Sequence, residues 1–289
     1  MGRNRCLPGT GFATLSDVVD LPSWVPLDVD VTQPSISRIW DWFLDGSHNF
    51  AVDRDVAAEM LKLMPEGPRM AQASRAFLRR AVRMCVESGI TQFLDIGSGI
   101  PTVGNVHEIA QSINPACRVV YVDIDPVAVS HTRQILAGNE RATVVRADLR
   151  SPREILAASE LRNMLDFTRP IALMLVAILH FIPDSDDPLG IIRQFHDVLA
   201  PGSHLVIGHG SRNTEGMPRE NLHSAREMYE RTVAQVSLRS RPEVMALFEG
   251  WELVYPGVVW IPQWRPDEFV TEADAILPNA GYAGVAQKL

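Results

Sequence analysis

The sequence is poor in cysteine and in positive charge, and both shortages exclude classes of protein. It has three cysteines in 289 residues, far apart and without a Cys-x-x-Cys pair. A disulfide framework or a cysteine-ligated zinc site is therefore not expected. Lysine and arginine number 27 against 35 aspartate and glutamate residues, a net charge of −8. This balance argues against nucleic acids and anionic membranes as partners, since both attract clustered positive charge.

Long hydrophobic runs are also missing. The longest apolar run, residues 171–182, falls short of the ~20 residues that a membrane-spanning helix needs. The first twenty residues contain glycine, proline and aspartate where a signal peptide would be apolar. The histidines are dispersed, without the spacing of metal ligands. We therefore expect a soluble cytoplasmic protein without a metal centre, as a monomer or a homodimer.

What the sequence does contain is an alternation of strand-like and helix-like segments. Five apolar runs have the composition of strands buried on both faces of a parallel sheet. They are residues 92–96, 119–123, 142–148, 171–176 and 204–208. Two more strand-like runs, residues 251–260 and 282–287, follow near the end. This order predicts an α/β fold with a doubly wound, mostly parallel sheet and a C-terminal antiparallel hairpin strand.

Three helical patterns precede the first strand. They are residues 36–46, 52–63 and 68–88. Residues 1–24, interrupted by glycine and proline, are expected to be a loose extension. Residues 25–289 are expected to form one domain, with 25–90 as a helical lid over a Rossmann-like sheet of residues 91–289. Five arginines of the third helical pattern are interpreted as its solvated face. They are Arg69, Arg75, Arg79, Arg80 and Arg83.

A glycine-rich turn follows the first strand-like run. Asp95 is followed by Gly97, Ser98 and Gly99, and glycine lets a ligand approach the backbone closely because it has no Cβ. On its own this motif is weak, since glycines after strands are common. The acids that end the next two runs strengthen it.

These acids are Asp123 and Asp148. Asp123 lies 28 residues after Asp95, where a carboxylate can bind both hydroxyls of an adenosine ribose. Asp148, followed by Leu149, can accept a hydrogen bond from the adenine amine. Because the carboxyl ends of parallel strands meet at one edge of a sheet, the three acids predict a nucleoside site there.

Two nucleoside cofactors are compatible with this pattern, NAD(P) and S-adenosylmethionine. The third glycine, Gly104, is displaced from the G-x-G-x-x-G spacing that binds pyrophosphate, and Pro101 removes a backbone donor. Asp95 would repel a pyrophosphate but attract the amino group and sulfonium of S-adenosylmethionine. No Tyr-x-x-x-Lys pair of short-chain dehydrogenases is present. The charge argument favours S-adenosylmethionine, and an NAD(P)-dependent reductase is the weaker alternative.

At these residues the sequence resembles class I S-adenosylmethionine-dependent methyltransferases, whose motif I is similar to residues 95–99. More narrowly, it resembles an actinobacterial methyltransferase family formerly labelled a domain of unknown function. The similar blocks are residues 38–54, 94–107, 175–183, 259–266 and 280–285. The likeness extends over about residues 25–289. The family usually has glycine where Asp45 stands and often asparagine where Ile124 stands.

The resemblance implies a class I methyltransferase fold with the N-terminal helices as a lid over S-adenosylmethionine. Asn49 and Arg54 of the lid could reach the methionine carboxylate, or could be a helix cap and a surface charge. Ile124 would pack beside the adenine, and the backbone near Ala177 would pass beside the cofactor. Aromatic residues of the lid are expected mainly to pack it against the sheet, or else to line an acceptor pocket. They are Trp40, Trp42, Phe43 and Phe50.

His180 is the candidate catalytic residue. It follows the fourth strand-like run, and a histidine there could accept a proton from the methyl acceptor, although it could equally be structural. His209, after the fifth run, is a second candidate. We expect in-line methyl transfer to a small molecule, such as a natural-product intermediate, with S-adenosylhomocysteine as product. The alternative is a protein that binds this cofactor for another reaction or as a sensor.

Overall fold

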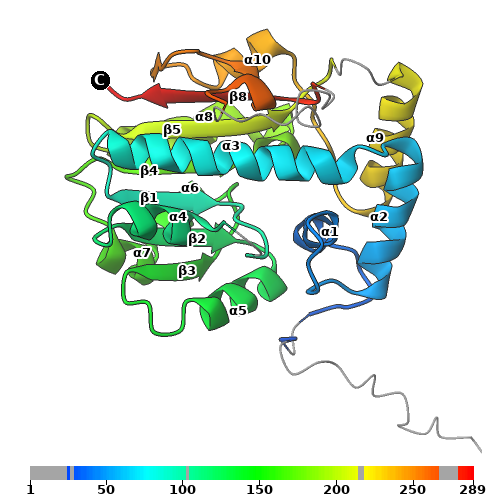
Figure 1. Cartoon of the computed structure of the whole chain (residues 1–289), viewed down its shortest axis with the longest axis horizontal. Helices are drawn as coiled ribbons and strands as arrows, with labels where there is room; N and C mark the ends of the chain where they lie inside the picture. The colour runs from blue at the N-terminus through cyan, green and yellow to red at the C-terminus, as the bar shows by residue number, and fades with distance from the viewer. Residues whose placement is uncertain (1–24, 27–28, 102–103, 214–217, 267–278) are drawn as a thin grey trace, which may run out of the picture.

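An eight-stranded sheet lies at the centre of the computed structural model (Figure 1). The structure describes residues 25–26, 29–101, 104–213, 218–266 and 279–289. The predicted extension, residues 1–24, lies outside the described residues. The strands are β1 (Gln92–Ile96), β2 (Arg118–Asp123), β3 (Ala142–Arg146), β4 (Ala172–Val176), β5 (His204–Gly210), β6 (Glu252–Leu253), β7 (Val259–Trp260) and β8 (Gly281–Gln287).

The strand order is β3-β2-β1-β4-β5-β8-β6, and β7 also pairs with β8. The first five strands are parallel, and β8 runs antiparallel to β5. This confirms the predicted α/β sheet with its antiparallel C-terminal strand. Residues 251–260 form β6 and β7 rather than one strand, because a turn at Tyr255 and Pro256 separates them. The Gly257 amide closes this turn by donating to the Val254 carbonyl at 2.7 Å.

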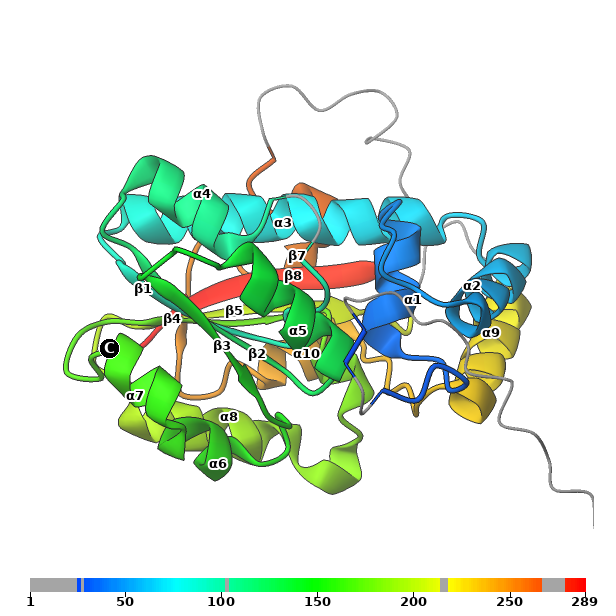
Figure 2. The same cartoon turned by 90° about the horizontal axis from the view of Figure 1, so that it is seen from below.

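Helices cover both faces of the sheet (Figure 2). Phe93 of β1 belongs to a buried apolar cluster on one face that includes Phe77, whereas Leu94 belongs to the cluster on the other face, with Ile155. This alternation follows from the two-residue period of a strand. The helices of the Phe93 face are α3 (Gly67–Glu87), α4 (Val106–Ile113) and α5 (Pro126–Ile135). The helices of the Leu94 face are α6 (Pro152–Ala157), α7 (Ser159–Met164), α8 (Pro188–Val198) and α10 (Arg241–Ala246).

The remaining helices form a cap beyond the carboxyl ends of the parallel strands (Figure 1). They are α1 (Ile36–Phe43), α2 (Ala51–Leu63) and α9 (Arg219–Thr232). Ile39, Met60 and Tyr229, one from each helix, belong to one buried apolar cluster. The cap thus includes α9, from late in the chain, whereas most of α3 packs along the sheet. No helix of the described residues is long and apolar enough to cross a membrane.

Polar contacts fasten the cap to the sheet. Within the cap, Nε of Arg38 in α1 donates to the Asp53 carboxylate of α2 at 2.9 Å, and both side chains are buried. Nη1 of the same arginine lies 4.0 Å from the carboxylate of Asp125, which follows β2. The Ser35 hydroxyl donates to Asp125, which caps α5 by accepting from the Val127 amide at 2.7 Å. The N-terminal end of α1 is therefore held directly over the end of β2.

Candidate functional site

The carboxyl ends of β1, β2 and β3 open into a cavity of about 570 Å³, which we call the nucleoside cavity. The structure brings nine of the predicted site residues together in its walls. They are Asp95, Gly97, Ser98, Gly99, Asp123, Ile124, Asp148, Leu149 and Ala177. Residues of α1 and α3 cover it, among them Ser37 and Arg75.

The turn after β1 requires glycine at position 97. Its φ angle is +74°, and its amide donates to the Val122 carbonyl at 2.8 Å. A Cβ at this position would lie 2.6 Å from Cγ1 of Ile178, so a larger residue would collide with the loop after β4. The neighbouring Ser98 hydroxyl is buried without a hydrogen-bond partner among the described residues. Such an unpaired group is expected where a ligand supplies the missing partner.

Asp123 is held rigidly at the end of β2. One carboxylate oxygen accepts from the Gly99 amide at 2.7 Å, and the other accepts from the Asp125 amide at 2.8 Å and the Ser37 hydroxyl at 3.4 Å. Burial raises the pKa of Asp123 to about 6. Each carboxylate oxygen can accept two hydrogen bonds, so one position remains for a ribose hydroxyl.

Asp95 and Arg75 place opposite charges near each other in the nucleoside cavity. Burial raises the pKa of Asp95 to about 7, while the positive charge of Arg75 opposes that rise. Burial also lowers the pKa of Arg75. The Arg75 guanidinium donates to the Ile100 carbonyl at 3.4 Å. A carboxylate beside a guanidinium complements an amino acid, whose ammonium and carboxylate groups have the opposite arrangement.

Sequence reasoning missed Arg75 by assigning it to the solvated face of α3. That interpretation is wrong for Arg75, which lines the nucleoside cavity, and for Arg80, which is buried and donates to the Trp264 and Ile261 carbonyls at 2.8 and 2.9 Å. It holds for the other three arginines, which are exposed. The inward position of Arg75 could have been found from its helical spacing. It lies four residues after Ala71 and three before Leu78, and both of these line the same cavity.

Asn49 and Arg54 do not line this cavity. The side-chain amide of Asn49 donates to the Asp41 carboxylate at 2.8 Å, and Nη1 of Arg54 donates to the backbone carbonyl of Asn49 at 2.9 Å. Asp41 also accepts from the His48 amide at 2.8 Å. Asp45 in the same loop has a φ angle of +58°, a conformation that favours the glycine usual in the family it resembles. These contacts shape the loop between α1 and α2.

The opposite end of the nucleoside cavity suits an adenine ring. The Ile124 side chain is 56% exposed there, and an apolar side chain left open to solvent can pack against a base. Asp148 forms an ion pair with Arg150, with 2.6 Å between Oδ2 and Nη2. Leu149 is buried behind them. The turn, the three acids and this apolar side chain together fit S-adenosylmethionine.

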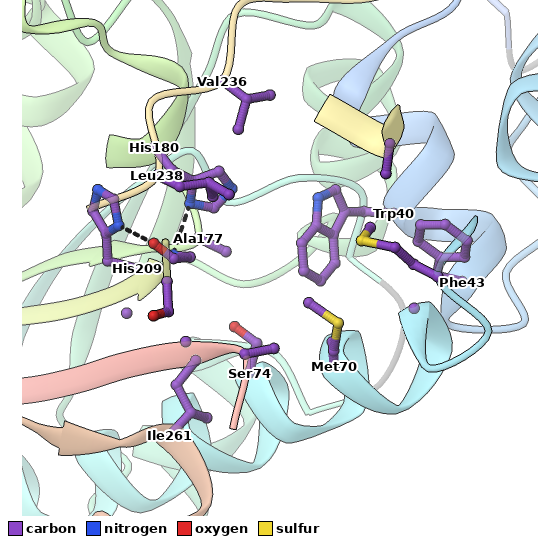
Figure 3. A pocket seen from close by; sticks show the side chains of 18 of the residues that line it. Trp40, Phe43, Met70, Ser74, Ala177, His180, His209, Val236, Leu238 and Ile261 are labelled. Carbon is purple, nitrogen blue, oxygen red and sulfur yellow. Dashed lines mark hydrogen bonds between the residues drawn. The ribbon is translucent and has the colours of Figure 1, made fainter. Parts of the chain in front are cut away.

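A second cavity of about 160 Å³ adjoins the first, and we call it the acceptor cavity (Figure 3). Both cavities are lined by Trp40, Ser74, Ala177 and Phe181. Ala177, just after β4, has a φ angle of +60°, and its amide donates to the Gly208 carbonyl at 2.8 Å. The backbone after β4 therefore turns at the boundary between the two cavities.

His180 and His209 both line the acceptor cavity. Nη1 of Arg239 donates to Nε2 of His209 at 2.8 Å, and Nδ1 of His209 lies 2.8 Å from the Gly210 carbonyl. Because arginine only donates, the proton of His209 must lie on Nδ1, and burial lowers the pKa of this histidine to about 4. Both ring nitrogens of His209 are thus committed, which leaves neither to act as a base.

The His180 ring is held as a hydrogen-bond donor. Its Nδ1 accepts from the Gly210 amide at 3.4 Å, so in the neutral ring Nε2 carries the proton. Burial, together with His209 and Arg239, holds the pKa of His180 well below its ordinary value. Figure 3 shows the ring across the acceptor cavity from Trp40. Among the described residues there is no cluster of three or more side chains suited to a metal ion.

The comparisons with known proteins agree with this geometry. A family model described as S-adenosyl methyltransferase matches residues 22–289. A candidate methyltransferase of Thermobifida fusca is 38% identical, with a TM-score of 0.84 over 92% of this chain and 99% of that one. A DUF574 family protein of Streptomyces avermitilis is 38% identical, with a TM-score of 0.82 over 90% and 99% of the two chains. No curated protein sequence matches this chain.

Proposed function

Because the chain belongs to the S-adenosyl methyltransferase family, we propose that it transfers a methyl group from S-adenosylmethionine to a small molecule held in the acceptor cavity. The observation that carries this proposal is the wall shared by the two cavities, with Ala177 at their boundary. A methyl group leaving the nucleoside cavity at this point would enter the acceptor cavity directly.

The residues of the nucleoside cavity have distinct roles in this proposal. Asp123 binds a ribose hydroxyl through its remaining acceptor position, while Asp148 and the Leu149 backbone meet the adenine. Asp95 binds the ammonium group and Arg75 binds the carboxylate of the methionine part, the role first considered for Asn49 and Arg54. Gly97, Ser98 and Gly99 let this part approach the backbone, and Ile124 packs on the adenine.

When bound, S-adenosylmethionine would supply a methyl group activated by its positively charged sulfur. Transfer to a lone pair of the acceptor would leave the carbon–sulfur electron pair on sulfur, and any acceptor proton would pass to water. The protein acts mainly by positioning the acceptor. The neutral His180 ring is a poor proton acceptor, because its pKa is lowered and its Nδ1 already accepts from the Gly210 amide. His180 therefore contributes by donating a hydrogen bond from Nε2. A natural-product intermediate is the class of acceptor that we favour.

Calorimetry tests the cofactor half of this proposal. We expect S-adenosylhomocysteine to bind the wild-type protein and NAD not to bind. Asp123→Ala should weaken S-adenosylhomocysteine binding at least tenfold, because a ribose hydroxyl loses a charged acceptor. The matched control is Asp166→Ala, since Asp166 is also an aspartate of the sheet region but lies outside the cavity. Equal binding by wild type and Asp123→Ala would refute the assignment.

Turnover tests the enzymatic half. The protein is incubated with isotopically labelled S-adenosylmethionine and fractionated small-molecule extracts, and labelled products are identified by mass spectrometry. Formation of a labelled small molecule together with S-adenosylhomocysteine supports methyl transfer. A sensor would bind the cofactor without producing either compound.

A further inference from the structure

The acceptor cavity is almost entirely apolar. Side chains from α1, α2, α3 and α9 and from the loop after β4 surround it. The large apolar ones include Trp40, Phe43, Met60, Met70, Phe181 and Leu238. Gly208, Gly210 and Gly281 form part of its floor at the ends of β5 and β8. A molecule bound here must bury apolar surface to gain affinity.

The size of the cavity limits the acceptor. Its volume is about 160 Å³. This is similar to a buried apolar cavity of roughly 150 Å³ in another protein, which accommodates benzene. Leu238 and Ile261 lie directly against Gly210 and Gly281, because a Cβ at either glycine would lie within 3 Å of Leu238 or Ile261 respectively. The part of an acceptor that lies inside the cavity is therefore about one six-membered ring with small substituents.

The charges around the cavity favour a neutral molecule. Of the described residues that line it, Arg226 is the one with a permanent charge, and its Nε already donates to Glu230 at 2.7 Å. Asp95, Asp123 and Arg75 all face the nucleoside cavity instead. Because Arg226 is already paired with Glu230, a carboxylate or ammonium group buried here would meet no unpaired counterion among these side chains, which is costly in an apolar site.

Tyr229 provides an unused polar group. The residue lines the acceptor cavity and is only 5% exposed. Its hydroxyl has no hydrogen-bond partner among the described residues, and its ring stacks on Phe181 with 5.9 Å between the ring centroids. Leaving a buried hydroxyl unpaired costs stability. A polar atom of a bound molecule would remove that cost.

We propose that the methyl acceptor is an uncharged single-ring compound with two polar atoms, one near His180 and Ala177 that receives the methyl group and one that hydrogen-bonds Tyr229. This inference rests on the proposed function, and it names the chemical class of the acceptor. Trp40 and Phe181, which border both cavities, hold the ring against the boundary at Ala177.

Four probes that share one para-substituted phenol ring test this inference. Tyrosol is neutral with two hydroxyls, tyramine adds a positive charge, 4-hydroxyphenylacetate adds a negative charge, and 4-ethylphenol lacks the second polar atom. Their dissociation constants are measured by NMR titration with the protein loaded with S-adenosylhomocysteine. We expect tyrosol to bind at least tenfold tighter than either charged probe. Equal or tighter binding by a charged probe overturns the inference, as does failure of all four to bind at millimolar concentration.

Tyr229→Phe tests the second polar contact while keeping the ring. It should weaken tyrosol binding about fivefold and leave 4-ethylphenol binding unchanged, and Tyr255→Phe, at a tyrosine that is 84% exposed, should change neither. Unchanged tyrosol binding by Tyr229→Phe overturns the contact. S-adenosylhomocysteine should bind wild type and Tyr229→Phe equally. Failure of the wild-type protein to bind it would instead refute the proposed function.

Discussion

Arg239 and His209 form a buried hydrogen bond of 2.8 Å beside the acceptor cavity. The same guanidinium donates to the Leu179 and Ile182 carbonyls, each at 3.0 Å, and to the Asp184 carboxylate at 2.5 Å. Arg239 thus joins the end of β5 to the loop that contains His180. Through Gly210, it also helps to fix which nitrogen of His180 carries the proton.

Arg239→Lys should therefore destabilise the protein. A lysine ammonium cannot reach acceptors that lie in several directions, and buried carbonyls would lose their donors. We expect the free energy of unfolding to fall by about 2–3 kcal/mol, measured by urea denaturation. Arg212→Lys is the control, because exposed Arg212 pairs with Glu243 at 3.2 Å and such a change costs at most about 0.5 kcal/mol. Equal losses in the two variants would contradict the joining role of Arg239.

Binding of S-adenosylhomocysteine should depend on pH through Asp95. Because the pKa of Asp95 is about 7 in the free protein, this group is protonated below pH 7 and must lose its proton to bind an ammonium. Affinity should fall by up to about tenfold per pH unit below 7, and binding should release a proton. Calorimetry in two buffers of different ionisation enthalpy measures this release. Asp95→Asn should bind more weakly and lose most of the pH dependence, and pH-independent wild-type binding would contradict the prediction.

The same pKa shift has a consequence for stability without cofactor. Because burial raises the pKa of Asp95 from 3.8 to about 7, the folded protein binds this proton more tightly than the unfolded chain does. The contribution to stability is complete below pH 4 and is lost as the pH rises through 7. Asp95→Asn should therefore be more stable than wild type at pH 8, with a smaller difference at pH 5, in urea denaturation.

The sheet and its acidic edge could be predicted because each rests on a local pattern. Apolar runs ending in Asp95, Asp123 and Asp148 specify both a buried strand and the acid that follows it. Parallel pairing then brings their carboxyl ends together, whatever the rest of the chain does.

The contribution of α9 to the cap and the shape of the acceptor cavity could not be predicted in this way, because they depend on contacts between distant segments. Helix α9 packs against α2, which places Tyr229 near residues of α1 that are far away in the sequence. His180 and His209 were recognisable as candidates, but their protonation depends on Arg239, whose sequence neighbours give no sign of it. Because arginine is charged, Arg75 was assigned to the solvated face of α3, although it lies on the side of the helix that lines the nucleoside cavity.

Arg75→Gln should weaken cofactor binding at the methionine end alone. The charged hydrogen bonds to the carboxylate would be lost, so the dissociation constant of S-adenosylhomocysteine should rise at least tenfold. Adenosine lacks the methionine part, and its binding should remain unchanged. Arg79→Gln, at an exposed position of the same helix, serves as control. Equal weakening of adenosine and S-adenosylhomocysteine by Arg75→Gln would show that Arg75 shapes the cavity instead.

Gly97→Ala should be damaging for two separable reasons. Alanine is strained at a φ angle of +74°, and its Cβ would also collide with Ile178. Gly138 has a φ angle of +86° with nothing within 4 Å of a Cβ, so Gly138→Ala measures the strain alone, about 1 kcal/mol. We expect Gly97→Ala to lose at least about 2 kcal/mol more in urea denaturation.

Adding Ile178→Ala to Gly97→Ala tests the collision directly. Ile178→Ala removes Cγ1 and Cδ1, which would lie 2.6 and 2.8 Å from the added Cβ, but it keeps its own Cβ at 2.8 Å, so it should recover part of the additional loss. Ile178→Ala in the wild-type background must be measured too, so that the interaction between the two substitutions is isolated. Additive losses would mean that the two side chains do not compete for the same space. The glycine at position 97 would then be required for its backbone conformation alone, and Gly97→Ala would cost no more than Gly138→Ala.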